Sequence, residues 1–188
     1  MTFRTATRRS GARAPVVLGA LAVALGLGAC SAVGDPSAAA LVDGEVVATP
    51  ADVATVLEEF PLELAGGQAP PPGQILSFLA LDGPVRELAI QTETPVVDQV
   101  QAREWLAEAD EAAGREPVRY SEPTLRLIAT NLTVNAIGQD QENAPLIQQM
   151  VSDLGDRLEV NPRYGAVDED GDGLVVPLEH PWLVSSDA

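Results

Sequence analysis

The chain has 188 residues, the length of one ordinary domain, and carries 28 Asp and Glu against 11 basic side chains, all of them Arg, for a net charge of -17. Because a nucleic-acid surface needs clustered cations, this balance excludes nucleic acid as a partner. Apolar residues make up 46% of the chain, enough to bury a core, and the single Cys excludes both a disulfide within the chain and a Cys-based metal cluster.

Residues 1–29 have the pattern of a lipoprotein signal peptide. Four Arg and no acidic residue precede the apolar stretch 15–27, which is shorter than the roughly 20 residues needed to span a bilayer. The sequence Leu27-Gly28-Ala29-Cys30 that follows resembles a bacterial lipobox, in which the Cys becomes the lipidated amino terminus. We therefore expect covalent lipid on Cys30. The alternative is an isolated Cys within a generic signal peptide.

The lipid at Cys30 is the expected attachment to the outer face of the cell membrane. After removal of residues 1–29 the chain holds 28 acidic residues against seven Arg, a net of -21, and so has no basic patch for lipid headgroups. Residues 30–38 are small and polar and have the composition of a tether. No other apolar run is long enough to span a bilayer.

The mature chain is predicted to begin with a hairpin and a capped helix. Residues 40–47 form two short β-branched runs around Asp43-Gly44, a strong hairpin signal. Thr49 is expected to cap a helix that has Pro in its first turn and a carboxylate at Asp52. Its apolar residues recur at helical spacing: Val53, Val56, Leu57 and Phe60.

Two further helices are expected after a Pro- and Gly-rich loop at 61–73. The first, around residues 75–89, is interrupted by Gly83-Pro84, which predicts a sharp kink or two separate helices. The second spans 95–113 and is ended by Gly114. Its predicted apolar stripe consists of Ala102, Trp105, Leu106, Ala109 and Ala113.

The remaining elements are two helices and short strands. Ser121 is expected to cap a helix whose broad apolar surface predicts contacts on two sides, at the centre of the fold. A last helix carries its apolar residues between 146 and 154 and ends at Gly155. Strand residues return at 158–160 and 173–176, and a chain of this length buries about two thirds of its unfolded surface.

This order of elements, together with the closing segment Asn161-Pro162-Arg163-Tyr164-Gly165, resembles the SurA N-terminal domain in the lipoprotein version found in actinobacteria, over residues 39–184. The opening segment is also similar to the start of PrsA-type foldases. The resemblance implies a mainly α fold with a small β element formed by the N- and C-terminal segments, followed by a tail at 185–188.

The same resemblance implies an extracytoplasmic holding chaperone that binds unfolded or secreted polypeptides. Better-known members carry a parvulin prolyl isomerase domain of about 90 residues, for which this chain has no room, so no isomerase activity is expected. A chaperone of this kind is expected to expose an apolar groove between its helices.

A short acidic loop supplies the alternative function. Its spacing fits the EF-hand pattern D-x-D-x-D-G-x5-E, whose ligands would be Asp168, Asp170, Asp172 and Glu179. An EF-hand needs flanking helices, whereas Pro and Gly lie on both sides here. A hairpin turn between strands near 160–167 and 174–176 is therefore predicted, with a Ca²⁺-binding envelope protein as the alternative and a structural envelope lipoprotein as a third interpretation.

The sequence provides no constellation for catalysis, and we expect no enzyme and no cofactor. His180 is the only His and cannot form a zinc site alone, and no nucleophile motif is present. Glu58-Glu59 and the acidic residues of 108–111 are predicted to be solvated surface. Trp105 and Trp182 are predicted to anchor the core and the closing segment.

Overall fold

The part of the chain that the structure describes begins with a tight hairpin. The computed structural model describes residues 37–61, 64, 66–168 and 173–178. Strand β1 (Ala40–Val42) turns into β2 (Glu45–Ala48) through Asp43 and Gly44, whose φ angles of 53° and 79° match the turn that two-residue hairpins prefer. The predicted hairpin is confirmed.

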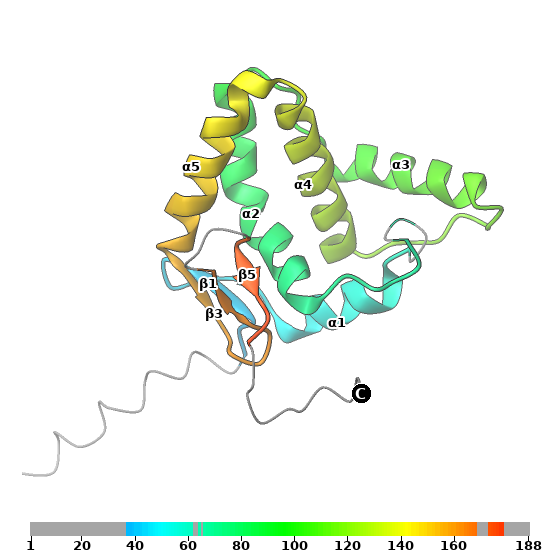
Figure 1. Ribbon diagram of the computed structural model, residues 1–188. Coiled ribbons are helices and arrows are strands. Elements are labelled where there is room, and N and C mark those ends of the chain that lie inside the picture. Colours follow the sequence, from blue (N-terminus) through cyan, green and yellow to red (C-terminus); the bar gives the residue numbers. More distant parts are fainter. Residues whose placement is uncertain (1–36, 62–63, 65, 169–172, 179–188) are drawn as a thin grey trace, which may run out of the picture. The chain divides into compact units, whose positions relative to one another are not determined.

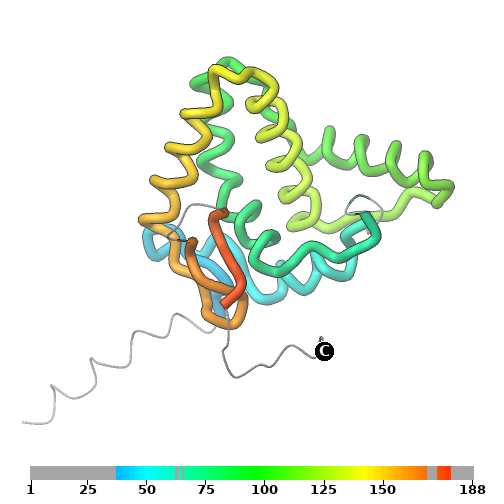
Figure 2. Tube along the Cα trace, viewed as in Figure 1, coloured from blue at the N-terminus to red at the C-terminus, as the bar shows by residue number. Residues whose placement is uncertain are grey.

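A second pairing joins the two ends of the folded part. Strand β3 (Leu158–Val160) pairs antiparallel with β1, with Ala40 opposite Val160, so the sheet order is β2-β1-β3. Figure 2 shows the segment near residue 40, in blue, beside the segment near residue 160, in orange. The predicted β element formed by the N- and C-terminal segments is therefore present.

The segment 161–165 secures this pairing. Asn161 donates from its backbone to the Ala39 carbonyl at 3.0 Å and from Nδ2 to the Ala38 carbonyl at 3.2 Å. Ala38, at the end of the predicted tether, is fully buried. The strands β4 (Ala166–Val167) and β5 (Val175–Val176) then form a separate antiparallel pair. Residues 169–172, for which the sequence predicts a hairpin turn, lie outside the described residues.

Helix α1 (Pro50–Glu59) starts with the predicted cap. Thr49 Oγ1 accepts from the backbone N–H of Asp52 at 3.2 Å, and Asp52 Oδ2 accepts from the backbone N–H of Thr49 at 2.8 Å. These two bonds form a capping box that satisfies both donors. Val53 and Val56 on the same helix are buried.

Helix α2 (Pro72–Gln91) is one helix, not two. It remains helical through Gly83 and Pro84, so the prediction of two separate helices is wrong, while its ribbon changes direction along its length (Figure 1). A Pro within a helix removes one hydrogen bond, and neighbouring turns carry the backbone past it. Leu79, Ala80 and Leu81 are buried just before this point.

Helix α3 (Gln99–Ala112) begins four residues later than predicted. Asp98 Oδ1 accepts from the N–H groups of Val100 and Gln101, and Gln101 returns a bond to the backbone of Asp98, which places the start of the helix there. Residues 95–97 therefore lie outside the helix. The sequence offers two start signals, Pro95 and the capping box at Asp98, and the helix begins at the capping box. Gly114, with φ at 71°, follows the end of the helix as expected.

Helix α4 (Glu122–Gly138) occupies the centre of the helical part, as predicted. It packs against α1, α2 and α3, and buried residues occur around much of its circumference. A short 3-10 turn (Gln141–Asn143) leads into α5 (Ala144–Gly155), which packs on α2 (Figure 1). The described part of the chain is thus mainly α with two small sheets, and none of its helices has the length and apolar character needed to cross a bilayer.

Candidate functional site

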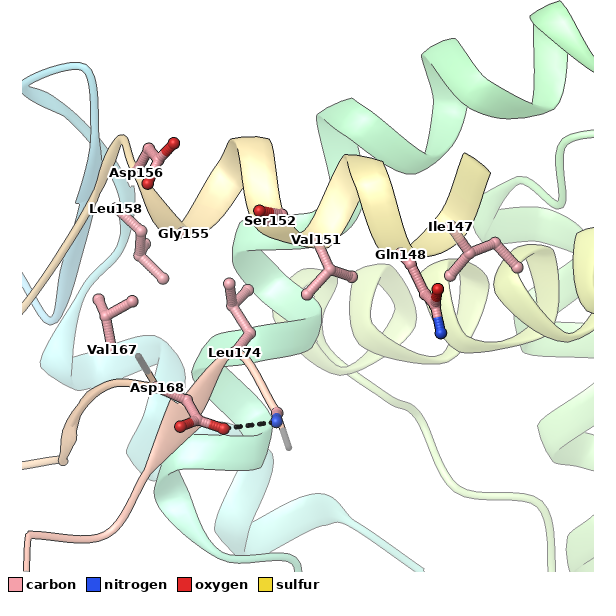
Figure 3. A pocket seen from close by; sticks show the side chains of 11 residues that line it. Ile147, Gln148, Val151, Ser152, Gly155, Asp156, Leu158, Val167, Asp168 and Leu174 are labelled. Carbon is pink, nitrogen blue, oxygen red and sulfur yellow. Dashed lines mark hydrogen bonds between the residues drawn. The ribbon is translucent and has the colours of Figure 1, made fainter. Parts of the chain in front are cut away.

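An apolar groove opens between α5 and the β4–β5 pair. Its volume is about 800 Å³ (Figure 3). Its apolar walls consist of Ile147 and Val151 from α5 and of Leu158, Val167 and Leu174 from the segments that follow. Groove volumes of this size are typical of ligand sites in proteins.

The α5 wall arises from the way this helix is packed. Apolar residues recur on it at helical spacing, but only Leu154 is fully buried, while Ile147 and Val151 are half-buried. Figure 3 shows the side chains of Ile147 and Val151 pointing from α5 toward the side on which Leu174 lies. Part of the apolar face of α5 therefore remains open to solvent along the groove.

The opposite wall is held by the paired strands and by Asp168. The backbone N–H of Asp168 donates to the Leu174 carbonyl at 3.1 Å, and Asp168 Oδ2 accepts from the backbone N–H of Gly173 at 2.7 Å. The wall reaches van der Waals range of Gly155, where a Cβ would lie 3.7 Å from Val167 Cγ1. The wall thus lies close to the end of α5 and leaves the groove open beside Ile147 and Val151.

The charges beside the groove are acidic. Asp156 and Asp168 line it, and no Arg is among the described residues that do so. The chain has a net charge of -17, so the surrounding field has the same sign. The groove therefore combines an apolar floor with acidic edges, a surface that favours apolar ligands with positively charged flanks.

Of the four predicted Ca²⁺ ligands only Asp168 is described. Its side chain accepts the hydrogen bond from Gly173, and a strand, β4, precedes it in place of the entering helix of an EF-hand. Asp170, Asp172 and Glu179 lie outside the described residues. Within the described ranges no three His, Cys, Asp or Glu side chains come together as a metal site. The Ca²⁺ hypothesis stays a prediction, as does the lipidation of Cys30, which also lies outside.

The structure contradicts the predicted positions of two residues on α3. Trp105, predicted to be core, has 37% of its surface exposed, because α3 contacts its neighbours through Ala102 and Leu106 instead. Asp110, predicted to be solvated, is completely buried. His180 and Trp182 lie outside the described residues.

Three groups donate hydrogen bonds to the buried carboxylate of Asp110. Its carboxylate accepts from Arg115 Nη2 at 2.6 Å, from the Val118 backbone at 3.1 Å and from the Tyr120 hydroxyl at 3.0 Å. Burial raises the pKa of Asp110, but these hydrogen bonds and the Arg115 charge outweigh it, and the pKa is lowered overall. The cluster ties the loop between α3 and α4 to the end of α3.

Glu59 is a second acid that the prediction of a solvated surface placed wrongly. Its Oε2 accepts from the backbone N–H and the hydroxyl of Ser121, at 2.9 and 2.7 Å, and from Thr124 Oγ1 at 2.7 Å. Burial raises the pKa of Glu59, while these hydrogen bonds lower it further than burial raises it. Ser121 is the N-cap of α4, as predicted, but the carboxylate of another helix satisfies the N–H of Ser121.

The groove, the Asp110 cluster and the Glu59 contact are features of this chain's own geometry. Comparison with protein-family models, with curated proteins and with solved structures finds no match.

Proposed function

We propose that this chain is an extracytoplasmic, lipid-anchored module that binds unfolded or secreted polypeptide segments, without isomerase activity. The observation that carries the proposal is the groove beside α5, where Ile147, Val151 and Leu174 line the same open apolar surface. Solvent-exposed apolar surface of this kind is a common property of binding sites for other chains.

The energetics favour weak and sequence-tolerant binding. Each apolar side chain that a client buries contributes about 1.5–3 kcal/mol, and the loss of translational and conformational freedom offsets much of that sum. The described lining has four polar side chains, those of Gln148, Ser152, Asp156 and Asp168, beside five apolar ones, so apolar contacts that tolerate different sequences form the larger part of it. A groove with these properties suits a holding chaperone, which must release its clients.

Charge and anchoring narrow the range of clients. The acidic edges at Asp156 and Asp168 favour client segments with basic residues beside their apolar centre. Lipid on Cys30 would hold the groove at the outer face of the membrane, where secreted chains emerge unfolded. A Cys30→Ala change should release the protein from the membrane fraction, and intact-mass measurement of extracted wild-type protein should show the added lipid.

The binding test uses short labelled peptides with Leu and Val at the centre. One peptide carries Lys at both ends and its partner carries Glu. With the full-length chain carrying Cys30→Ser, the Lys peptide should bind about tenfold more tightly than the Glu peptide, as measured by fluorescence anisotropy. Equal affinities, or no binding of either peptide, would refute the proposal.

A matched pair of variants places the binding in the groove. Ile147→Glu puts a charge on the half-buried groove wall, and Gln149→Glu adds the same charge to an exposed position of the same helix. We expect the first to weaken binding of the Lys peptide about tenfold and the second to leave it unchanged. Circular dichroism melts of both variants report whether the fold is retained. A folded Ile147→Glu variant with wild-type affinity would contradict the assignment.

A further inference from the structure

A second pocket lies on another part of the described chain, among the helices. Its volume is about 350 Å³, and its walls come from the end of α1, the α1–α2 loop, α2, α3 and α4. The residues that line it are Phe60, Leu64, Pro70, Gln74, Ile75, Phe78, Trp105, Leu127, Ile128 and Asn131. It shares no residue with the groove beside α5.

Aromatic rings gather at this pocket. Phe60, Phe78 and Trp105 come from three different helices or their ends, and they are all the Phe and Trp residues that the structure describes. The two described Tyr lie elsewhere, in the Asp110 cluster and beside Arg163. Such a concentration offers ring faces and edges against which another ring can pack.

Core packing does not account for Trp105. Ala102 and Leu106 already form the buried contact of α3, and both are completely inaccessible. Trp105 leaves more than a third of its surface in solvent at the edge of the pocket. A large apolar side chain that stays exposed beside a cavity is placed to contact a ligand there.

The described residues that line the pocket carry no charge, although the chain as a whole is strongly acidic. Its polar groups are the amides of Gln74 and Asn131 and the indole N–H of Trp105. Asn131 Oδ1 accepts from Asn135 Nδ2 at 3.0 Å, which leaves the Asn131 Nδ2 group as a donor. A charged ligand would lose its hydration here without gaining a countercharge.

We propose that this pocket binds a small uncharged compound with an aromatic ring and an amide or hydroxyl group. The ring would pack against Phe60, Phe78 and Trp105, and the polar group would bond the amides at the rim. The volume and the mainly apolar lining with a few polar groups are those of a small-molecule site. The proposal does not depend on polypeptide binding in the groove beside α5.

The test compares two compounds of the same shape. Indole-3-acetamide is neutral, and indole-3-acetate carries a negative charge on the same ring system. Saturation-transfer NMR on the full-length chain with Cys30→Ser should give a Kd of about 1 mM or tighter for the amide. The acetate should bind at least about fivefold more weakly. Equal binding of the two compounds, or no binding of the amide, overturns the proposal.

Two variants on the same helix locate the site. Trp105→Ala removes a partly exposed ring and should weaken the amide about fivefold, whereas Val100→Ala, at another exposed position of α3, should leave its Kd unchanged. A chain that ends at Leu178 provides the last comparison. If the shorter chain binds the amide and the full-length chain does not, the C-terminal segment of the chain itself occupies the pocket. That result overturns the proposal.

Discussion

Asp110 shows how a single acidic residue can stabilise this fold from the inside. It sits completely buried, with Arg115, the Val118 backbone and Tyr120 all donating to its carboxylate. An ionised carboxylate in the interior is tolerated only when such partners replace its water. The contact is therefore a condition for the loop between α3 and α4 to stay in place.

Asp110→Asn should destabilise the protein by about 3 kcal/mol, because it removes the charge that Arg115 pairs with and leaves a buried donor unsatisfied. Tyr120→Phe, which removes one hydroxyl, should cost only about 1 kcal/mol. Urea unfolding at neutral pH measures both values. Similar, small losses in the two variants would contradict the role given to the carboxylate.

The lowered pKa of Asp110 sets the sign of a pH effect. Because the folded-state pKa lies below the unfolded value of about 3.9, the ionised form stabilises the fold above that value, and this stability is lost as the pH falls through the folded-state pKa. Urea unfolding of the wild type should therefore show falling stability below about pH 4. Asp110→Asn should show a smaller loss over the same range.

Gly165 is fixed by space and by backbone conformation. Its φ is 142°, and a Cβ there would overlap the Val176 carbonyl oxygen of the neighbouring strand. Gly165→Ala should cost about 2 kcal/mol or more and loosen the β4–β5 pair, as measured by thermal unfolding and amide exchange. Gly83→Ala is the comparison, because nothing beyond the two chain neighbours lies within 4 Å of a Cβ there. It should change stability by less than about 1 kcal/mol, since the gain in helix propensity is offset by contact of the new methyl group with the ring of Pro84.

At the scale of elements, the sequence predicts most of what local chemistry decides. The Asp43-Gly44 turn and the Thr49 cap depend on residues a few positions apart, and both are confirmed. The predicted start of α3 at residue 95 is wrong, because Pro95 and Asp98 are both helix-start signals and the helix begins after Asp98. The exposure of Trp105 and the burial of Asp110 depend on which helices meet, and no local pattern contains that information.

The groove illustrates the same limit. The apolar spacing of α5 predicts a buried face, yet only Leu154 is fully buried, and the other apolar residues of that face are partly exposed. The sequence led us to expect an apolar groove between helices. The described groove beside α5 has one wall made of strands and their flanking residues, while the pocket among the helices is the smaller aromatic one.

Glu59 couples two helices that are far apart in sequence. It ends α1 and accepts three hydrogen bonds from Ser121 and Thr124 at the start of α4, where a negative charge is favoured. Glu59→Gln should cost about 1–2 kcal/mol in urea unfolding, since the neutral amide is a weaker acceptor. Glu58→Gln, at the exposed neighbouring position, should change stability by less than about 0.5 kcal/mol. Equal effects of the two changes would rule out the coupling.

At the scale of the molecule, the fold is closed by its most distant residues. Ala40 pairs with Val160, and Asn161 donates to the carbonyls of Ala38 and Ala39, so the β1–β3 pairing joins segments that the whole helical part separates in the sequence. Contacts of such large sequence separation carry a high entropy cost and form late. Spacing rules cannot specify this pairing, and only the order of elements indicated it.

The negative net charge lowers the stability of the fold through self-repulsion, and it strengthens the binding of basic peptides. Salt should therefore change these two properties in opposite directions. The chain repels itself at a net charge of -17, and the partly exposed ion pairs Arg86–Asp82 and Arg157–Asp43 contribute little in return. Raising NaCl from about 0.02 M to about 0.5 M shortens the Debye length several-fold and should raise the melting temperature. The same change should weaken binding of the Lys-flanked peptide, whose attraction to the acidic edges is screened. Calorimetric melts and anisotropy titrations in the same buffers measure the two effects. A melting temperature that falls with salt would show that attraction between ion pairs outweighs charge repulsion on the surface of this protein.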